Sequence, residues 1–307
     1  MRRQRERISS THVDRHNEAM SLEALQSMAS QLASSYTPYM YDHDPRFPTL
    51  GRAISGEVVE LIDGHHALEV VSESWEPTDD AESTKGDGRR IPISPKEISL
   101  FEIEYDRSFE GRWGRQFVGS LENLADGRIE SRPYSKKALE PVSTIVIAAG
   151  IFALGNIASG FFKKLGEYLW GRLRSTLSPI GTKKSKSGQL LEFRFYVSNE
   201  EHQFEVLVLV EEPTAAAIAD LFSQQFPGLD SIVEPLVKGF PDLARVVIAW
   251  RKKRLQLLYA LRNDAYPVVI TPEAGFPDLS MLEKRARAAT LPKPIPPTPR
   301  AKRKLKR

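Results

Sequence analysis

The sequence predicts an α+β protein in which one hydrophobic helix separates two β-containing regions. Three observations support this fold class. A run of 22 residues contains no Asp, Glu, Lys, Arg or His, although 27% of the chain is charged. Hydrophobic residues alternate with polar ones on both sides of that run, as in half-buried strands. The net charge changes sign across it. We expect a small antiparallel β domain, then the hydrophobic helix continuing into an amphipathic helix, then an antiparallel-sheet domain of order ββααββ.

The uncharged run covers residues 141–162. As a helix it would be about 33 Å long, close to the roughly 30 Å hydrocarbon core of a bilayer. Small residues recur along it, which in lipid allows helices to approach closely. A membrane span is the leading interpretation; a buried helix of a soluble core and an inserting interfacial hairpin are the alternatives. The residues assigned to the membrane helix are Ile145, Gly150, Phe152, Gly155, Asn156 and Gly160.

The continuation to residue 177 has helical periodicity, with hydrophobic residues on one face and cations mainly on the other. Aromatic and basic side chains are typical where a span meets lipid headgroups. The predicted interface anchors are Lys163, Lys164, Tyr168 and Trp170.

The charge distribution gives the predicted topology. Residues 1–140 carry 18 Lys and Arg against 25 Asp and Glu, a net charge of −7, whereas residues 163–307 carry 25 against 15, a net charge of +10. Because cytoplasmic flanks of membrane spans are enriched in cations, we expect a single-span membrane protein with its C-terminal domain in the cytoplasm. Anionic lipid headgroups are its expected partner, and the hydrophobic helix could form a homo-oligomer.

Before the span, residues 1–47 are expected to form a basic tail and an amphipathic helix that begins at Ser21. Residues 48–140 are expected to form the β domain, with a hairpin turn at Asp63-Gly64 and a further strand over 98–105.

After the 141–177 helices, a basic linker is expected at 178–189, an α+β domain at 190–272, and a helix with a disordered Pro-rich basic tail at 273–307. The α+β domain has two predicted hairpins, and the second has the basic tip Arg251-Lys252-Lys253-Arg254.

The sequence gives little support for an enzyme. It has no cysteine, which excludes disulfides and thiolate chemistry. It also lacks the glycine-rich nucleotide-binding motifs and the Gly-x-Ser-x-Gly elbow. A weak metal or acid–base hypothesis rests on His43, Asp44 and His65. Residues of the same kinds lie next to them in the sequence, but the spacing of the cluster matches no signature. These neighbours are Asp42, Asp63 and His66. We therefore expect no catalytic residue, metal, cofactor or small-molecule substrate.

The leading functional hypothesis is a non-enzymatic, membrane-anchored protein for interaction, sensing or self-association. The alternative is a soluble protein that binds nucleic acid non-specifically through its basic hairpin tip and C-terminal tail. The predicted basic contacts are Arg251, Lys252, Lys253, Arg254, Lys302, Arg303 and Lys304.

Overall fold

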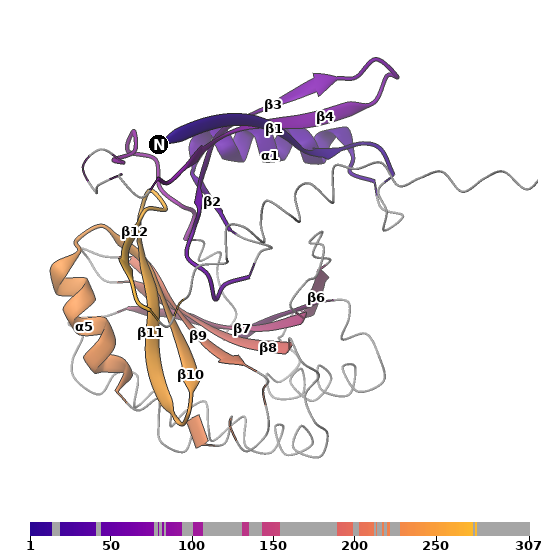
Figure 1. Cartoon of the computed structure of the whole chain (residues 1–307). Coiled ribbons are helices and arrows are strands. Elements are labelled where there is room, and N and C mark those ends of the chain that lie inside the picture. Colours follow the sequence, from indigo (N-terminus) through magenta and orange to yellow (C-terminus); the bar gives the residue numbers. More distant parts are fainter. Residues whose placement is uncertain are drawn as a thin grey trace, which may run out of the picture. The chain divides into compact units, whose positions relative to one another are not determined.

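The protein is a mixed α+β structure with two β-sheets (Figure 1). The computed structural model describes residues 1–13, 19–40, 44–76, 79, 82, 84–93, 101–106, 131–134, 143–153, 189–198, 203–211, 213, 217, 220–221, 228–272 and 274. Residues Met1–Gly275 form one unit. The domain boundaries expected from the sequence stay predictions.

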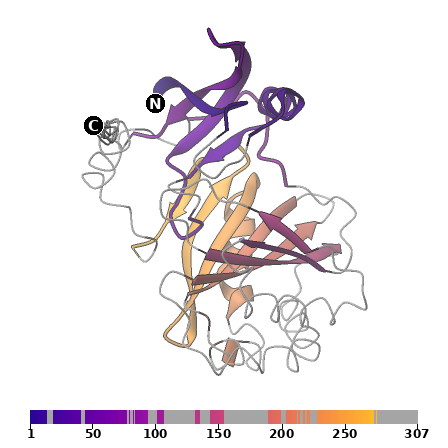
Figure 2. The ribbon, with the colours of Figure 1, turned by 90° about the vertical axis from the view of Figure 1, so that its right-hand side faces the viewer.

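The first sheet is antiparallel and has the strand order β1-β4-β3-β2. Helix α1 packs on β3 and β4, as Figure 2 shows. The helix begins where the sequence predicts, because the Ser21 hydroxyl caps it by accepting from Ala24 N at 3.2 Å. The elements are β1 (Arg2–Ser10), α1 (Leu22–Ser34), β2 (Thr37–Tyr39), β3 (Gly51–Glu60) and β4 (His66–Ser74).

The core of this sheet lies between α1 and the strands. Leu25 and Leu32 of the helix pack against Leu68 and Val70 of β4. Gly56 of β3 permits the close approach, because a Cβ there would lie 2.7 Å from Leu32 Cδ1. The helical stripe and the alternating strands predicted from the sequence therefore bury the same apolar surface.

The second sheet has the order β12-β11-β10-β9-β8-β7-β5-β6. Its strands are β5 (Phe101–Asp106), β6 (Ser131–Tyr134), β7 (Ser143–Ala153), β8 (Gln189–Ser198), β9 (Gln203–Glu211), β10 (Leu243–Arg251), β11 (Arg254–Arg262) and β12 (Pro267–Ile270), and helix α5 spans Leu229–Gly239.

This sheet is mixed, not antiparallel as predicted. The hairpins β8–β9 and β10–β11 are antiparallel, as expected, but β9 and β10 are parallel. The reason is the connection between them, which contains α5. A long helical crossover returns the chain to the same end of the sheet, whereas a short turn reverses it.

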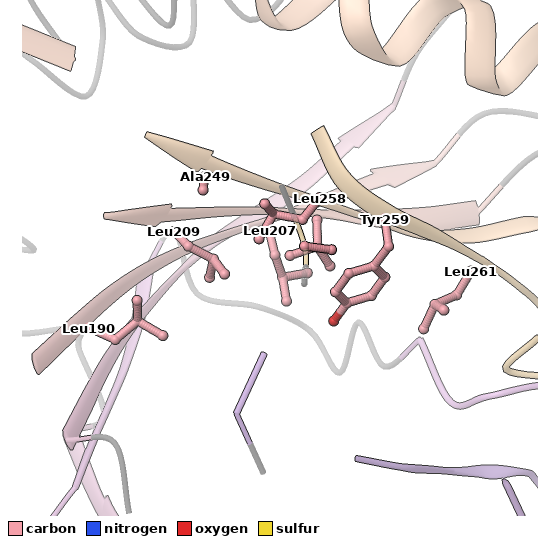
Figure 3. Packing of buried hydrophobic residues seen from close by; sticks show 9 residues of the cluster. Leu190, Leu207, Leu209, Ala249, Leu258, Tyr259 and Leu261 are labelled. Carbon is pink, nitrogen blue, oxygen red and sulfur yellow. The ribbon is translucent and has the colours of Figure 1, made fainter. Parts of the chain in front are cut away.

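Apolar residues from β8 to β11 gather on one side of this sheet (Figure 3). Leu190, Leu207 and Leu209 project toward the same side as Leu261. Tyr259 is fully buried in the cluster, and its hydroxyl donates to Pro45 O at 3.0 Å. The N-terminal chain before β3 therefore contacts the second sheet directly.

The predicted transmembrane helix is wrong. Ile145, Gly150 and Phe152 lie in strand β7, which is paired with β5 and β8. Interior strands of mixed sheets read as near-continuous hydrophobic runs, and a run rich in Ile and Val favours a strand over a helix. The remaining residues assigned to the span and its interface lie outside the described residues: Gly155, Asn156, Gly160, Lys163, Lys164, Tyr168 and Trp170.

Among the helices that the structure describes, none is both long enough and apolar enough to cross a bilayer. The predicted single span and the membrane topology that depended on it are therefore wrong. The expected lipid and homo-oligomer partners stay predictions.

A second correction concerns the N-terminal basic tail. Residues 2–10 form strand β1, which is antiparallel to β4. Arginines along β1 pair across the sheet with glutamates: Arg3 with Glu73 at 2.8 Å, Arg5 with Glu57 at 3.4 Å and Arg7 with Glu69 at 3.6 Å. Alternating charge in this segment therefore marks a polar face of a strand.

A buried cation connects the two sheets. The Arg52 side chain on β3 is only 3% exposed. Its Nε donates to Glu73 Oε2 at 2.9 Å, and its Nη1 lies 3.2 Å from Asp264 Oδ2 in the turn between β11 and β12. The guanidinium also lies over the Tyr36 ring, 4.5 Å from the centroid, and 5.2 Å from the Trp75 centroid. This site is called the Arg52 network below.

We expect Arg52→Met to lower the free energy of unfolding by about 3 kcal/mol, because it leaves two buried carboxylates short of one cation. Arg7→Met removes an exposed arginine from the same sheet and is expected to cost less than about 1 kcal/mol. Urea unfolding followed by circular dichroism measures both. Equal losses for the two variants would contradict the importance of the Arg52 network.

The Arg52 network also predicts acid sensitivity. Burial alone would raise the pKa of the Asp264 carboxyl, but the hydrogen bond and ion pair with Arg262 outweigh it, so that pKa is lowered from 3.8. A lowered folded-state pKa gives stability that is complete above the unfolded pKa and is lost as the pH falls through the folded pKa.

We therefore expect Asp264→Asn to destabilise the protein at about pH 6 and to match the parent protein more closely near about pH 3. Urea unfolding of both proteins across this range measures the difference between their free energies of unfolding. A difference that is constant with pH would show that the Asp264 charge does not contribute to stability.

Candidate functional site: the basic hairpin tip

The tip of the β10–β11 hairpin is the candidate site with the clearest geometry. Arg251 and Arg254 are the last paired residues, so Lys252 and Lys253 form a two-residue turn. Both lysines have positive φ, 51° and 60°. Positive φ at both central residues is typical of the type I′ turn, whose twist matches that of the flanking strands. Asn and Gly are the usual residues here, so two lysines are unusual in this turn.

The tip presents its cations to solvent. Lys252, Lys253 and Arg254 are exposed, whereas Arg251 is half-buried. Lys252 makes no hydrogen bond or ion pair with any residue that the structure describes. Lys253 Nζ lies 3.5 Å from Asp220 Oδ2, but the lysine side chain is 82% exposed. Such an exposed pair is weak and leaves the lysine able to contact a solution anion.

Arg251 has a different role from its neighbours. Its guanidinium makes two contacts with the Glu211 carboxylate, with Nε 3.1 Å from Oε2. Glu211 is the last residue of the neighbouring strand β9. A two-point arginine–carboxylate contact fixes orientation. Arg251 therefore anchors the base of the tip, which leaves Lys252, Lys253 and Arg254 as the cations that reach solution.

A second charged cluster lies within the sheet, but it is built as a structural network. Arg245 Nη2 is 2.8 Å from Glu205 Oε1, and Arg194 Nη2 is 2.6 Å from Glu192 Oε1. Burial alone would lower the pKa of Arg194, but the Glu192 and Glu205 carboxylates outweigh it and hold that pKa well above the usual value. The two glutamates are almost fully buried, at 3% and 2% exposed, so their charge is balanced by the two arginines.

The weak metal hypothesis is not supported by the positions of its residues. His43 lies outside the described residues, with Asp42. Asp44 is paired with Arg46, and its Oδ1 accepts from Arg46 Nε at 2.9 Å. His65 lies instead beside His12, with stacked rings 4.0 Å apart. Within the part of the chain that the structure describes, no group of three or more metal-ligating side chains could hold a metal ion.

No pattern in the sequence indicates that His12 lies beside the β3–β4 turn. His12 Nε2 lies 2.7 Å from Asp63 Oδ2. This hydrogen bond is the largest cause that lowers the pKa of the Asp63 carboxyl, and the Asp63 contact with the His65 backbone N–H adds to it. The pairing follows from strand β1, so only recognition of β1 as a strand could have found it. These groups tie the end of β1 to the turn that the sequence predicted at Asp63-Gly64.

Comparison of the chain with protein-family models, with curated proteins and with solved structures finds no match. A function therefore has to be inferred from the residues of this chain.

The backbone of the tip gives a testable expectation. A non-glycine residue in the left-handed region costs about 1–2 kcal/mol, and glycine's extra freedom in the unfolded chain offsets about 0.5–1 kcal/mol of the relief. Lys253→Gly should therefore stabilise the protein by about 0.5–1 kcal/mol relative to Lys253→Ala, which removes the same charge but keeps the Cβ. Urea unfolding compares the two variants. Identical stabilities would mean that the turn is not strained at Lys253.

Proposed function

We propose that this protein binds nucleic acid without reading its sequence, through the β10–β11 hairpin tip and the basic C-terminal segment. The observation that carries the proposal is the tip itself. Three adjacent exposed cations, Lys252, Lys253 and Arg254, are held at the end of a hairpin that a neighbouring strand anchors through Arg251. Cations fixed in this way lose less freedom on binding than cations on a mobile chain.

Phosphate is the ligand chemistry that fits best. Lysines supply charge rather than a planar pattern of donors, so they suit phosphate oxygens better than base edges. The four residues of the tip include no aromatic side chain. Stacking on unpaired bases is therefore not available there, and we expect no preference for single strands from the tip.

The C-terminal segment supplies additional charge. Residues 300–307 contain six Lys and Arg, among them Lys302, Arg303 and Lys304. They lie outside the described residues, so their contribution is proposed from sequence alone. A dense basic segment in the same chain as an ordered basic tip is typical of proteins that neutralise several phosphates at once.

The test measures binding of the full chain to a labelled DNA duplex by fluorescence anisotropy over a series of salt concentrations. Each phosphate contact contributes about −0.9 to the slope of log affinity against log salt. Lys252→Gln/Lys253→Gln should therefore make the slope less negative by about 1.8, and should weaken binding of unrelated duplexes equally.

The matched control is Lys85→Gln/Lys238→Gln. It removes the same total charge from two exposed lysines that lie elsewhere, each paired with a nearby glutamate. We expect its slope to equal that of the parent protein. If both double variants change the slope equally, only the net charge matters and the tip is not the binding site.

Deletion of residues 291–307 separates the contributions of the two basic elements. The deleted protein should still bind, more weakly, and should keep its sensitivity to Lys252→Gln/Lys253→Gln. Unchanged binding after the deletion would remove the C-terminal segment from the proposal, and no duplex binding by the parent protein would refute the proposal as a whole.

A further inference from the structure

Strand β1 is a long edge strand that contains no proline. It has nine residues, and β4 is its only strand neighbour among the residues that the structure describes. The opposite edge of the same sheet is protected, because β2 has three residues and contains Pro38. Short strands, prolines, β-bulges and charged side chains are the usual means of preventing an edge from accepting another strand. Strand β1 is long and has no proline, and its register shift comes only after Arg7, so residues 2–7 pair with β4 in unbroken register. Its arginines disfavour an added strand that carries like charge, but not one that carries opposite charge.

The register shows which residues of β1 turn their backbone outward. His65 and Trp75 flank β4, and both are hydrogen-bonded to the β3 side: Leu61 N donates to His65 O, and Trp75 N donates to Leu50 O. The odd-numbered residues of β4 therefore direct their backbone groups at β3. Thr11 N donates to His66 O, so even-numbered residues face β1. In an antiparallel ladder, only alternate residues bond to a given neighbour.

The even-numbered residues Val70, Ser72 and Ser74 lie opposite Glu6, Gln4 and Arg2 of β1. Those three β1 residues therefore direct their backbone groups at β4. Since direction alternates along a strand, Arg3, Arg5 and Arg7 direct their N–H and C=O groups away from the sheet.

The same three arginines line one face of the edge. Their side chains are 71%, 57% and 51% exposed. On the side toward β4 and β3 they meet Glu73, Glu57 and Glu69. Alternate residues of a strand are about 6.6–6.8 Å apart, so the arginines form a regular row. A strand added at this edge would place every second side chain directly beside one of them.

We propose that the edge of β1 is a docking site for an extended segment of a partner protein that carries Asp or Glu at alternate positions. The incoming strand would exchange backbone hydrogen bonds with Arg3, Arg5 and Arg7. Its acidic side chains would extend the row of charge pairs across the sheet, each arginine then lying between two carboxylates. Backbone pairing supplies affinity in this mode of recognition, and the alternating side chains supply specificity.

A peptide fits this edge better than nucleic acid does. The outward groups of Arg3, Arg5 and Arg7 include carbonyl oxygens as well as N–H donors. A second strand satisfies both kinds of group, whereas a phosphate backbone would satisfy the donors and be repelled by the carbonyls. The proposal does not depend on the proposed function, because the two surfaces share no residue.

The test uses two synthetic peptides of identical composition on the full chain. One alternates Glu and Val over six residues, and the other has the three Glu grouped before the three Val. Isothermal titration calorimetry should show the alternating peptide binding about ten-fold more tightly, as three cross-strand charge pairs of ordinary strength imply. Non-specific attraction to the basic tail or the hairpin tip would be the same for both peptides. Equal affinity would overturn the proposal.

Amide hydrogen exchange tests the backbone part on the parent protein. In the free protein, the amides of Gln4 and Glu6 should be protected and those of Arg3, Arg5 and Arg7 should exchange rapidly. Addition of the alternating peptide should protect the second set by at least about ten-fold. Binding without this protection would show that only side chains make contact, and the docking of a strand would be wrong.

Arg5→Gln/Arg7→Gln should reduce binding of the alternating peptide to the level of the grouped one. Lys85→Gln/Lys238→Gln, which removes equal charge elsewhere, should leave it unchanged. If the arginine variant instead impairs duplex binding and neither peptide binds, the edge is a nucleic-acid contact and the proposal is wrong. Loss of a dimer in that variant, without peptide binding, would assign the edge to a second copy of the chain.

Discussion

Burial of the Arg52 charge is the constraint on which the arrangement of the ordered chain depends. A guanidinium that is removed from water has to recover its lost hydration from fixed partners. Its partners come from two different sheets: Glu73 from β4, and Asp264 from the turn between β11 and β12. The Tyr36 and Trp75 rings cover it and exclude water. Displacing one sheet from the other would therefore leave buried charges unpaired, a much larger penalty than the loss of an exposed ion pair.

The Arg52 network extends through shared carboxylates to the first proposed interaction surface and to one end of strand β11. Glu73 also accepts from Arg3 of the edge strand β1, with Arg3 Nε 2.9 Å from its Oε1. Asp264 also binds Arg262, at the end of strand β11. The first surface is thus fixed at one end by the same carboxylate that holds Arg52. The second surface lies at the opposite end of β11, beyond Arg254. Rigid strands hold both rows of cations, although the two surfaces suit different ligands.

The sequence predicted the local structure well where residues close in the chain also pair in space. The β3–β4, β8–β9 and β10–β11 hairpins are confirmed. Their turns are signalled by short polar or glycine-containing segments between alternating runs. The basic tip was found for this reason. The positive φ angles of Lys252 and Lys253 could not be foreseen, because lysine gives no signal for that conformation.

The failures share a different cause, which is dependence on distant partners. A run of apolar residues is compatible with a helix or with an interior strand, and only the neighbours β5 and β8 decide that residues 143–153 form β7. In the same way, the arginines of β1 resemble a mobile tail until the glutamates of β3 and β4, more than 50 residues away, are placed beside them. The parallel pairing of β9 and β10 likewise depends on the helical crossover between them.

Because the predicted span at residues 141–162 is wrong, the change of net charge along the chain requires another cause, and the two basic clusters contribute to it. Residues 163–307 have a net charge of +10. The hairpin tip contributes four cations and residues 300–307 contribute six, and residues 163–189 contain seven Lys and Arg against one Glu. The positive charge of this part of the sequence is therefore concentrated in short segments and is not evenly distributed along it. Concentrated positive charge of this kind is the electrostatic pattern that attracts a polyanion, and orientation in a bilayer is not needed to explain it.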